Sequence, residues 1–131
     1  GELQPLKILL AEDNAVNRRL AQFLLKSQGY EVWDVGSAAE AFALLKERHP
    51  DLILMDIQLP EMDGLAATRQ LKANPLTREI PVVAVTSYAM KGDETKAADA
   101  GCDGYVTKPI DKKLFLETVA RTLAERERQA A

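Results

Sequence analysis

Four short apolar segments of this chain lead into polar residues that could take part in phosphoryl chemistry. The segments 6–11, 52–55, 80–85 and 104–107 lead into Glu12-Asp13, Asp56, Thr86 and Lys108. If the segments are neighbouring strands of one parallel sheet, their carboxyl ends share an edge. We therefore expect three carboxylates, one hydroxyl and one ammonium group to converge on a single small site.

The three carboxylates predict a metal ion. Carboxylates about 4–5 Å apart repel one another, and a cation would relieve this repulsion. Carboxylate and carbonyl oxygens suit a hard ion such as Mg²⁺ or Mn²⁺. We expect Asp13 and Asp56 to bind the ion directly and Glu12 to act through a water molecule. The alternative is that Glu12, Asp13 and Asn14 only cap the helix that follows them.

Asp56 is also a candidate nucleophile, because carboxylates can form aspartyl phosphates. In this interpretation Lys108 holds a phosphoryl oxygen by its charge, and Thr86 donates its hydroxyl to another. Each residue alone has an ordinary explanation, since a strand-end lysine is usually solvated and a strand-end threonine usually bonds within a turn. Their shared position at the ends of successive strands favours the common site. Pro109 allows a cis peptide bond that would direct Lys108 inward.

Apolar segments alternate with helical patterns along the chain, which is typical of a parallel sheet built from strand–helix–strand units. We predict strands at 6–11, 30–35, 52–55, 82–85 and 105–107, and helices at 15–27, 38–49, 65–73, 93–100 and 111–125. The predicted fold class is α/β, a doubly wound, flavodoxin-like sandwich with a five-stranded parallel sheet. The alternating segment 30–35 suggests an edge strand, which is compatible with strand order 2-1-3-4-5. That order places the first and third strands together at the switch point, where such sheets bind ligands.

Local sequence patterns predict the caps of two helices and the buried side of another. Ser37 and Asp93 are expected to cap the second and fourth predicted helices. The spacing of Leu20, Phe23 and Leu24 predicts that these side chains form the core-facing side of the first helix.

Length and composition indicate one globular domain. The chain has 131 residues, a hydrophobic fraction of 47% and a net charge of −3. We assign 6–124 to the domain, 1–5 to a linker or cloning remnant, and 125–131 to a charged tail. The charge argues against binding of nucleic acid or an anionic membrane. A cytoplasmic protein is expected, because no segment resembles a membrane span or signal peptide and Cys102 cannot form an internal disulfide.

The combined pattern resembles the receiver domain of bacterial two-component response regulators over about residues 6–124. The matching residues are Glu12-Asp13-Asn14, Asp56, Leu59-Pro60, Met62-Asp63-Gly64, Thr86-Ser87 and Lys108-Pro109. The segment 85–93 is especially similar to single-domain cell-cycle regulators and to receivers of hybrid histidine kinases. Both a stand-alone regulator and the receiver of a longer protein fit this resemblance.

The resemblance implies that Asp56 accepts a phosphoryl group from the phosphohistidine of a histidine kinase or histidine phosphotransfer protein. Mg²⁺ or Mn²⁺ would be held by Asp13, Asp56 and the backbone carbonyl of Gln58, with Glu12 acting through water. The domain would catalyse its own phosphoryl transfer and dephosphorylation and would not be a turnover enzyme.

The resemblance also implies a switch. Thr86 would move to the phosphoryl group, and Tyr105 would turn inward with it. The face formed by residues 88–115 would then control an output partner or a homodimer. Gln58 and Tyr88 occupy positions that tune the lifetime of the phosphate in this family.

Three other classes of protein are alternatives. A pseudo-receiver would keep the fold as an interaction module without the chemistry. A flavodoxin-like protein that binds a flavin or nucleotide would need a phosphate-binding loop where Glu12-Asp13-Asn14 stands. A Mg²⁺-dependent phosphohydrolase would need a second acid two residues after Asp56, where Gln58 stands.

Overall fold

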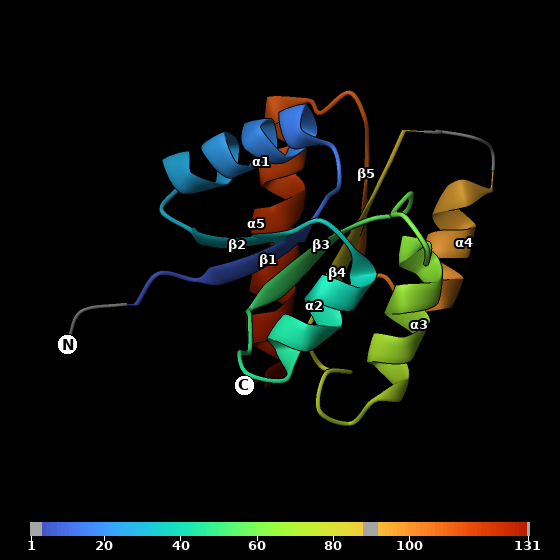
Figure 1. The fold of residues 1–131 in the computed structure, drawn as a ribbon. Coiled ribbons are helices and arrows are strands. Elements are labelled where there is room, and N and C mark those ends of the chain that lie inside the picture. Colours follow the sequence, from blue (N-terminus) through green and yellow to red (C-terminus); the bar gives the residue numbers. More distant parts are fainter. Residues whose placement is uncertain (1–3, 88–91, 131) are drawn as a thin grey trace.

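The computed structural model describes residues 4–87 and 92–130, which form a single parallel sheet covered by helices. The strands are β1 (Lys7–Ala11), β2 (Glu31–Val35), β3 (Leu52–Asp56), β4 (Val82–Thr86) and β5 (Gly104–Thr107). The helices are α1 (Ala15–Ser27), α2 (Ala38–Leu45), α3 (Gly64–Ala73), α4 (Asp93–Ala100) and α5 (Lys112–Ala130). The strand order is β2-β1-β3-β4-β5, so the predicted fold class and topology are confirmed (Figure 1).

Alternate residues of the strands face two hydrophobic cores on opposite sides of the sheet. Ile8 and Leu10 of β1 pack with α1 and α5, whereas Leu9 and Ala11 pack with α2 and α3. Figure 1 shows the same division of the helices between the two faces. All five residues of β3 are buried, which explains its continuously apolar sequence. Within the described ranges, no helix has the length and apolar character needed to cross a membrane.

The core-facing side of α1 agrees with the prediction at Leu24 and differs from it at Leu20 and Phe23. Its buried residues are Ala21, Leu24 and Leu25, whereas Leu20 and Phe23 are 41% and 68% exposed. The sequence of α1 contains two apolar stripes at helical spacing, and the helix buries the one that includes the small Ala21. The other stripe therefore lies in solvent.

Helix ends also differ from the predictions. α2 ends at Leu45, before residue 49, and Gly92 stands at the cap position that was predicted for Asp93. α5 continues past residue 125 to Ala130. The Arg126 guanidinium lies 3.0 Å from Asp51 Oδ1 and holds this part of α5 against the start of β3.

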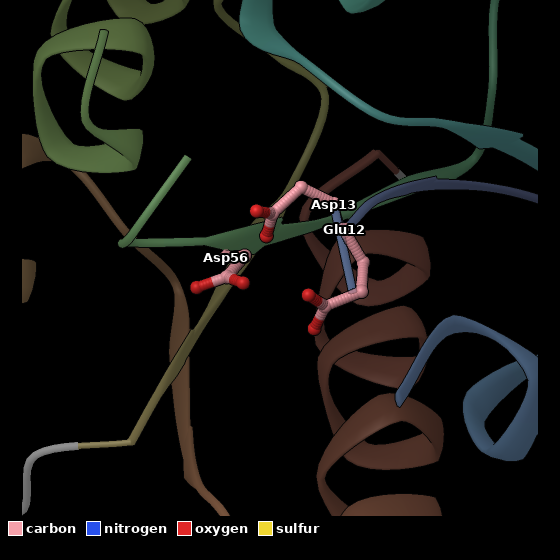
Figure 2. Close-up of side chains that lie close together, drawn as sticks. All are labelled: Glu12, Asp13 and Asp56. Atoms are coloured by element: carbon pink, nitrogen blue, oxygen red, sulfur yellow. The ribbon is translucent and has the colours of Figure 1, made fainter. Parts of the chain in front are cut away.

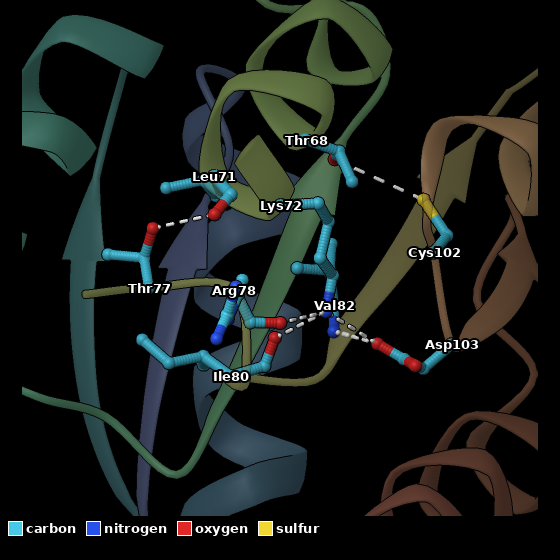
Figure 3. Close-up of polar contacts among 9 residues, drawn as sticks. All are labelled: Thr68, Leu71, Lys72, Thr77, Arg78, Ile80, Val82, Cys102 and Asp103. Carbon is cyan, nitrogen blue, oxygen red and sulfur yellow. Dashed lines mark hydrogen bonds and ion pairs between the residues drawn. The ribbon is translucent and has the colours of Figure 1, made fainter. Parts of the chain in front are cut away.

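A polar clamp joins α3 to the amino ends of β4 and β5 (Figure 3). The Lys72 ammonium donates to the carbonyl oxygens of Arg78 and Ile80 at 3.2 and 2.8 Å, and it lies 3.1 Å from Asp103 Oδ2. The same Asp103 oxygen accepts a bond from the Val82 amide at 2.9 Å. The clamp therefore fixes the amino ends of these strands, opposite the carboxyl ends of the strands where the acidic residues lie.

Candidate functional site

The structure brings the three predicted acids together at the carboxyl ends of β1 and β3 (Figure 2). Ala11 and Met55 are paired in the sheet, so Glu12 follows β1 beside Asp56, the last residue of β3. One oxygen from each of Glu12, Asp13 and Asp56 lies within 4.8 Å of the others. Glu12 and Asp56 are buried, whereas Asp13 is exposed. The site is therefore closed on the sheet side and open at Asp13.

Lys108 follows β5 and reaches across the sheet edge to the two buried acids. Its Nζ lies 2.7 Å from Glu12 Oε1 and 3.0 Å from Asp56 Oδ2. The Lys108 amide donates to the Thr86 carbonyl at 2.7 Å, which ties the lysine to the end of β4. The Lys108–Pro109 peptide bond is cis.

Burial and close charges set the ionisation of this group. Burial and the neighbouring Asp56 raise the pKa of Glu12, while the Lys108 ammonium and the Asn14 amide oppose the rise. Burial alone would lower the pKa of Lys108, but Glu12 and Asp56 outweigh it and the net pKa is raised. Lys108 therefore remains a full positive charge between the two carboxylates.

The donor set fits a divalent hard cation. With all acids ionised, three carboxylates and one ammonium leave a formal charge of −2, which a divalent ion would balance. The side chains offer only oxygen ligands, as Mg²⁺ prefers. Asp13 faces solvent, so the site has an open approach.

The backbone around Asp56 is tightly packed. Asp56 Oδ1 accepts a bond from the Gln58 amide at 2.8 Å, and Oδ2 faces Lys108. The Gly64 amide donates to the Ile57 carbonyl at 2.7 Å. A Cβ atom at Gly64 would lie 2.2 Å from the Asp56 carbonyl oxygen, so only glycine lets α3 begin this close to the end of β3.

The predicted switch residues lie on the two strands beyond β3. Thr86 is the last residue of β4 and is buried, and its neighbour Val85 pairs with Asp56. Tyr105 lies on β5 with a partly exposed side chain. A cleft of about 400 Å³ beside Thr86 runs between α3 and α4. Tyr88, the other predicted tuning residue besides Gln58, lies outside the described residues.

Of two further residues near the acids, Asn14 was considered from the sequence as a cap of the following helix, and Arg18 was assigned no role. The Asn14 amide donates to Glu12 Oε2 at 3.1 Å, and its side chain caps α1. One helical turn later, Arg18 donates from a guanidinium nitrogen to the Glu12 carbonyl at 3.2 Å. The spacing of four residues between Asn14 and Arg18 was the available signal, because it places both on one side of the helix.

Comparisons with known proteins agree with this geometry. A family model described as response regulator receiver domain matches residues 8–120. The polar-differentiation response regulator DivK of Brucella ovis is 47% identical over 118 residues, which cover 90% of this chain and 96% of DivK.

Solved structures give the same result. The receiver domain of a sensor histidine kinase from Pseudomonas aeruginosa, solved with a magnesium ion in its active-site cleft, is 34% identical. The match has a TM-score of 0.84 and covers 92% of this chain and 99% of that one. A response regulator from Chloroflexus aurantiacus aligns with a TM-score of 0.89 at 26% identity, covering 92% and 99% of the two chains.

Proposed function

The chain belongs to the response regulator receiver family and is a phosphoacceptor of two-component signalling, and on this premise we propose that Asp56 accepts the phosphoryl group. The observation that supports this assignment is the contact of the Lys108 ammonium with Asp56 at the edge where three acids meet. A pseudo-receiver is not favoured, because the acids and the lysine of the phosphoacceptor site are all present.

In the proposed reaction, a carboxylate oxygen of Asp56 attacks the phosphorus atom of a phosphohistidine. The new P–O bond forms as the P–N bond breaks, and the imidazole nitrogen leaves with the electron pair and takes a proton from solvent. Lys108 stabilises negative charge on a phosphoryl oxygen. The same groups would serve the later attack of water on the aspartyl phosphate, so the domain would catalyse both its phosphorylation and its dephosphorylation.

A divalent cation fits the acids beside Asp56. Asp13, Asp56 and the Gln58 backbone carbonyl would hold Mg²⁺ or Mn²⁺, and Glu12 would act through water. The bound ion would neutralise charge on the phosphoryl oxygens. Lys108 already neutralises part of the charge on Glu12 and Asp56. Asp13 is the one of the three carboxylates that is exposed to solvent.

The exposed stripe of α1 is the surface that we assign to the phosphodonor. Val16, Leu20 and Phe23 are 76%, 41% and 68% exposed and follow one another at helical spacing. Val16 lies three residues after Asp13, so the stripe begins at the open side of the site. A histidine kinase or phosphotransfer protein must cover this opening to deliver its phosphoryl group, and its apolar contact surface would bury the stripe. Such a partnership fits the cytoplasmic location expected from the sequence.

The switch would act through the opposite side of the site. Thr86 would donate its hydroxyl to the phosphoryl group, and Tyr105 would turn inward as Thr86 moves. The face formed by residues 88–115 would then bind an output partner or a second copy of the chain. Within this face Leu114 is 61% exposed, whereas Phe115 is buried in the core.

Phosphorylation by a small-molecule donor tests the assignment of Asp56. Acetyl phosphate with Mg²⁺ should add one phosphoryl group to the wild-type chain and none to Asp56→Asn, as measured by intact-protein mass spectrometry. Beryllofluoride should shift the amide resonances of Thr86 and Tyr105 in the wild type alone. The assignment would be wrong if Asp56→Asn gained the phosphoryl group at the wild-type rate.

A further inference from the structure

Arg18 of α1 contacts the backbone of the loop that carries the exposed acid. One guanidinium nitrogen donates to the Glu12 carbonyl oxygen at 3.2 Å. The Nε atom lies 3.5 Å from Asp34 Oδ2, near the end of β2. Arg18 therefore joins α1, the end of β2 and the β1–α1 loop.

Besides the bond from the Asn14 amide to Glu12 Oε2, Glu12 is held at three points, and Arg18 supplies one of them. The Glu12 amide donates to the Val35 carbonyl at 3.0 Å, and Glu12 Oε1 lies 2.7 Å from Lys108 Nζ. These contacts fix the strand end and the side chain. The carbonyl held by Arg18 belongs to the peptide group that joins Glu12 to Asp13, so Arg18 sets the tilt of that peptide group.

We propose that Arg18 is a positioning residue that holds the peptide group before Asp13 in the orientation needed to bind Mg²⁺. This inference rests on the proposed function, in which Asp13 is a metal ligand. The Asp13 side chain is exposed, so its direction depends on the backbone that carries it. Loss of a group that orients a metal ligand typically weakens metal affinity about 10- to 100-fold.

A purely structural role would have a different signature. If Arg18 only tied α1 to β2, its loss would lower stability and leave metal affinity unchanged. Asp34→Asn weakens the ion pair with Arg18 and leaves the bond to the Glu12 carbonyl in place. We therefore expect Asp34→Asn to change Mg²⁺ affinity much less than loss of Arg18 does.

The experiment is a Mg²⁺ titration of the ¹⁵N-labelled full chain without a phosphodonor, followed through the amide resonances of Asn14 and Gln58. Arg18→Met keeps the aliphatic stem and removes the donor, and Arg19→Met changes an exposed arginine on the same helix. Arg18→Met should weaken Mg²⁺ binding about tenfold, and Arg19→Met should bind as the wild type does. Urea unfolding of each variant in EDTA measures the structural contribution separately.

The kinetics provide a second measurement. With acetyl phosphate, Arg18→Met should need about tenfold more Mg²⁺ for half-maximal phosphorylation and should reach the wild-type rate at saturating Mg²⁺. A folded Arg18→Met variant with wild-type Mg²⁺ affinity would overturn the positioning role, as would equal losses in Arg18→Met and Asp34→Asn. If the wild type itself bound no Mg²⁺, the proposed metal site would fail first, and the two failures are thereby distinguished.

Discussion

Glu12 and Lys108 form an ion pair of 2.7 Å in which both side chains are more than nine-tenths buried. The pair joins the end of β1 to the residue after β5, across the full width of the site. Because Lys108 also contacts Asp56, one ammonium group compensates two buried carboxylates. The lysine thus contributes to stability before any phosphoryl group arrives.

Lys108→Met should therefore destabilise the metal-free protein. Removal of one partner of a buried ion pair leaves uncompensated charge and costs about 3 kcal/mol. Urea unfolding in EDTA should show this loss, and Mg²⁺ should restore part of it by offsetting the charge of Glu12 and Asp56. Lys112→Met, at an exposed position of α5, is the control and should leave the free energy of unfolding unchanged within about 0.5 kcal/mol. Equal stability of the two variants would contradict a stabilising role for Lys108.

Much of the fold follows from local sequence patterns. The segments that became β3 and β4 are continuously apolar because both faces of these strands are covered, and the alternating pattern of β2 is compatible with the observed strand order. That order is enough to place Glu12 beside Asp56. Lys108 was predicted to reach the same edge because β5 ends there.

Features that depend on contacts between distant residues were not predictable in this way. The segment after residue 124 was assigned to a charged tail, but Arg126 pairs with Asp51, which is 75 positions away in the sequence. The buried side of α1 could not be chosen from periodicity, because α1 carries two apolar stripes. The bond from Arg18 to the Glu12 carbonyl likewise depends on how α1 lies against the sheet.

The thiol of Cys102 should make the free energy of unfolding depend on pH, and this contribution can be measured separately by removing the thiol. Burial raises the pKa of its thiol above the ordinary value of 9.0, so the folded chain keeps the proton at a pH where the unfolded chain has lost it. The thiol's contribution to stability is therefore present below pH 9.0 and is lost as the pH rises through the folded-state pKa. The free energy of unfolding should fall more steeply above pH 9 in the wild type than in Cys102→Ala.

Alkylation of Cys102 provides the independent control for this interpretation. Each unit of pKa shift lowers the thiolate fraction about tenfold, so iodoacetamide should react much more slowly with the folded chain than with the urea-unfolded chain at pH 8. Equal rates in the two states would show that burial does not protect the thiol.

The Lys72 clamp should support stability without affecting phosphoryl transfer. Lys72→Met leaves two carbonyl oxygens and Asp103 without their ammonium partner, and the free energy of unfolding should fall by about 1–3 kcal/mol. Asp103→Asn and the double variant complete a cycle, which should give a coupling of about 0.5 kcal/mol or more. Phosphorylation by acetyl phosphate should match the wild type, because the clamp lies at the opposite edge of the sheet. A selective loss of phosphorylation would show that the clamp acts on the site.

The choice of phosphodonor distinguishes an effect of the α1 stripe on donor binding from an effect on the chemistry of the site. Phe23→Lys places a charge in the stripe and should slow transfer from a phosphohistidine protein that phosphorylates the wild-type chain. Loss of one aromatic contact that is buried in the complex with the donor costs about 1–2 kcal/mol, which is roughly tenfold in the rate of transfer. The rate with acetyl phosphate should stay at the wild-type level, because the small donor needs no protein surface.

Leu76→Lys is the matched control for this experiment. Leu76 is 81% exposed, and it lies between α3 and β4, away from the carboxyl ends of the strands. A lysine at this position should therefore leave the rates of phosphoryl transfer from both donors at the wild-type level. If Phe23→Lys slowed acetyl phosphate as much as the protein donor, the substitution would be acting on the site itself. If Phe23→Lys slowed neither donor, the phosphodonor would have to approach Asp56 over another surface.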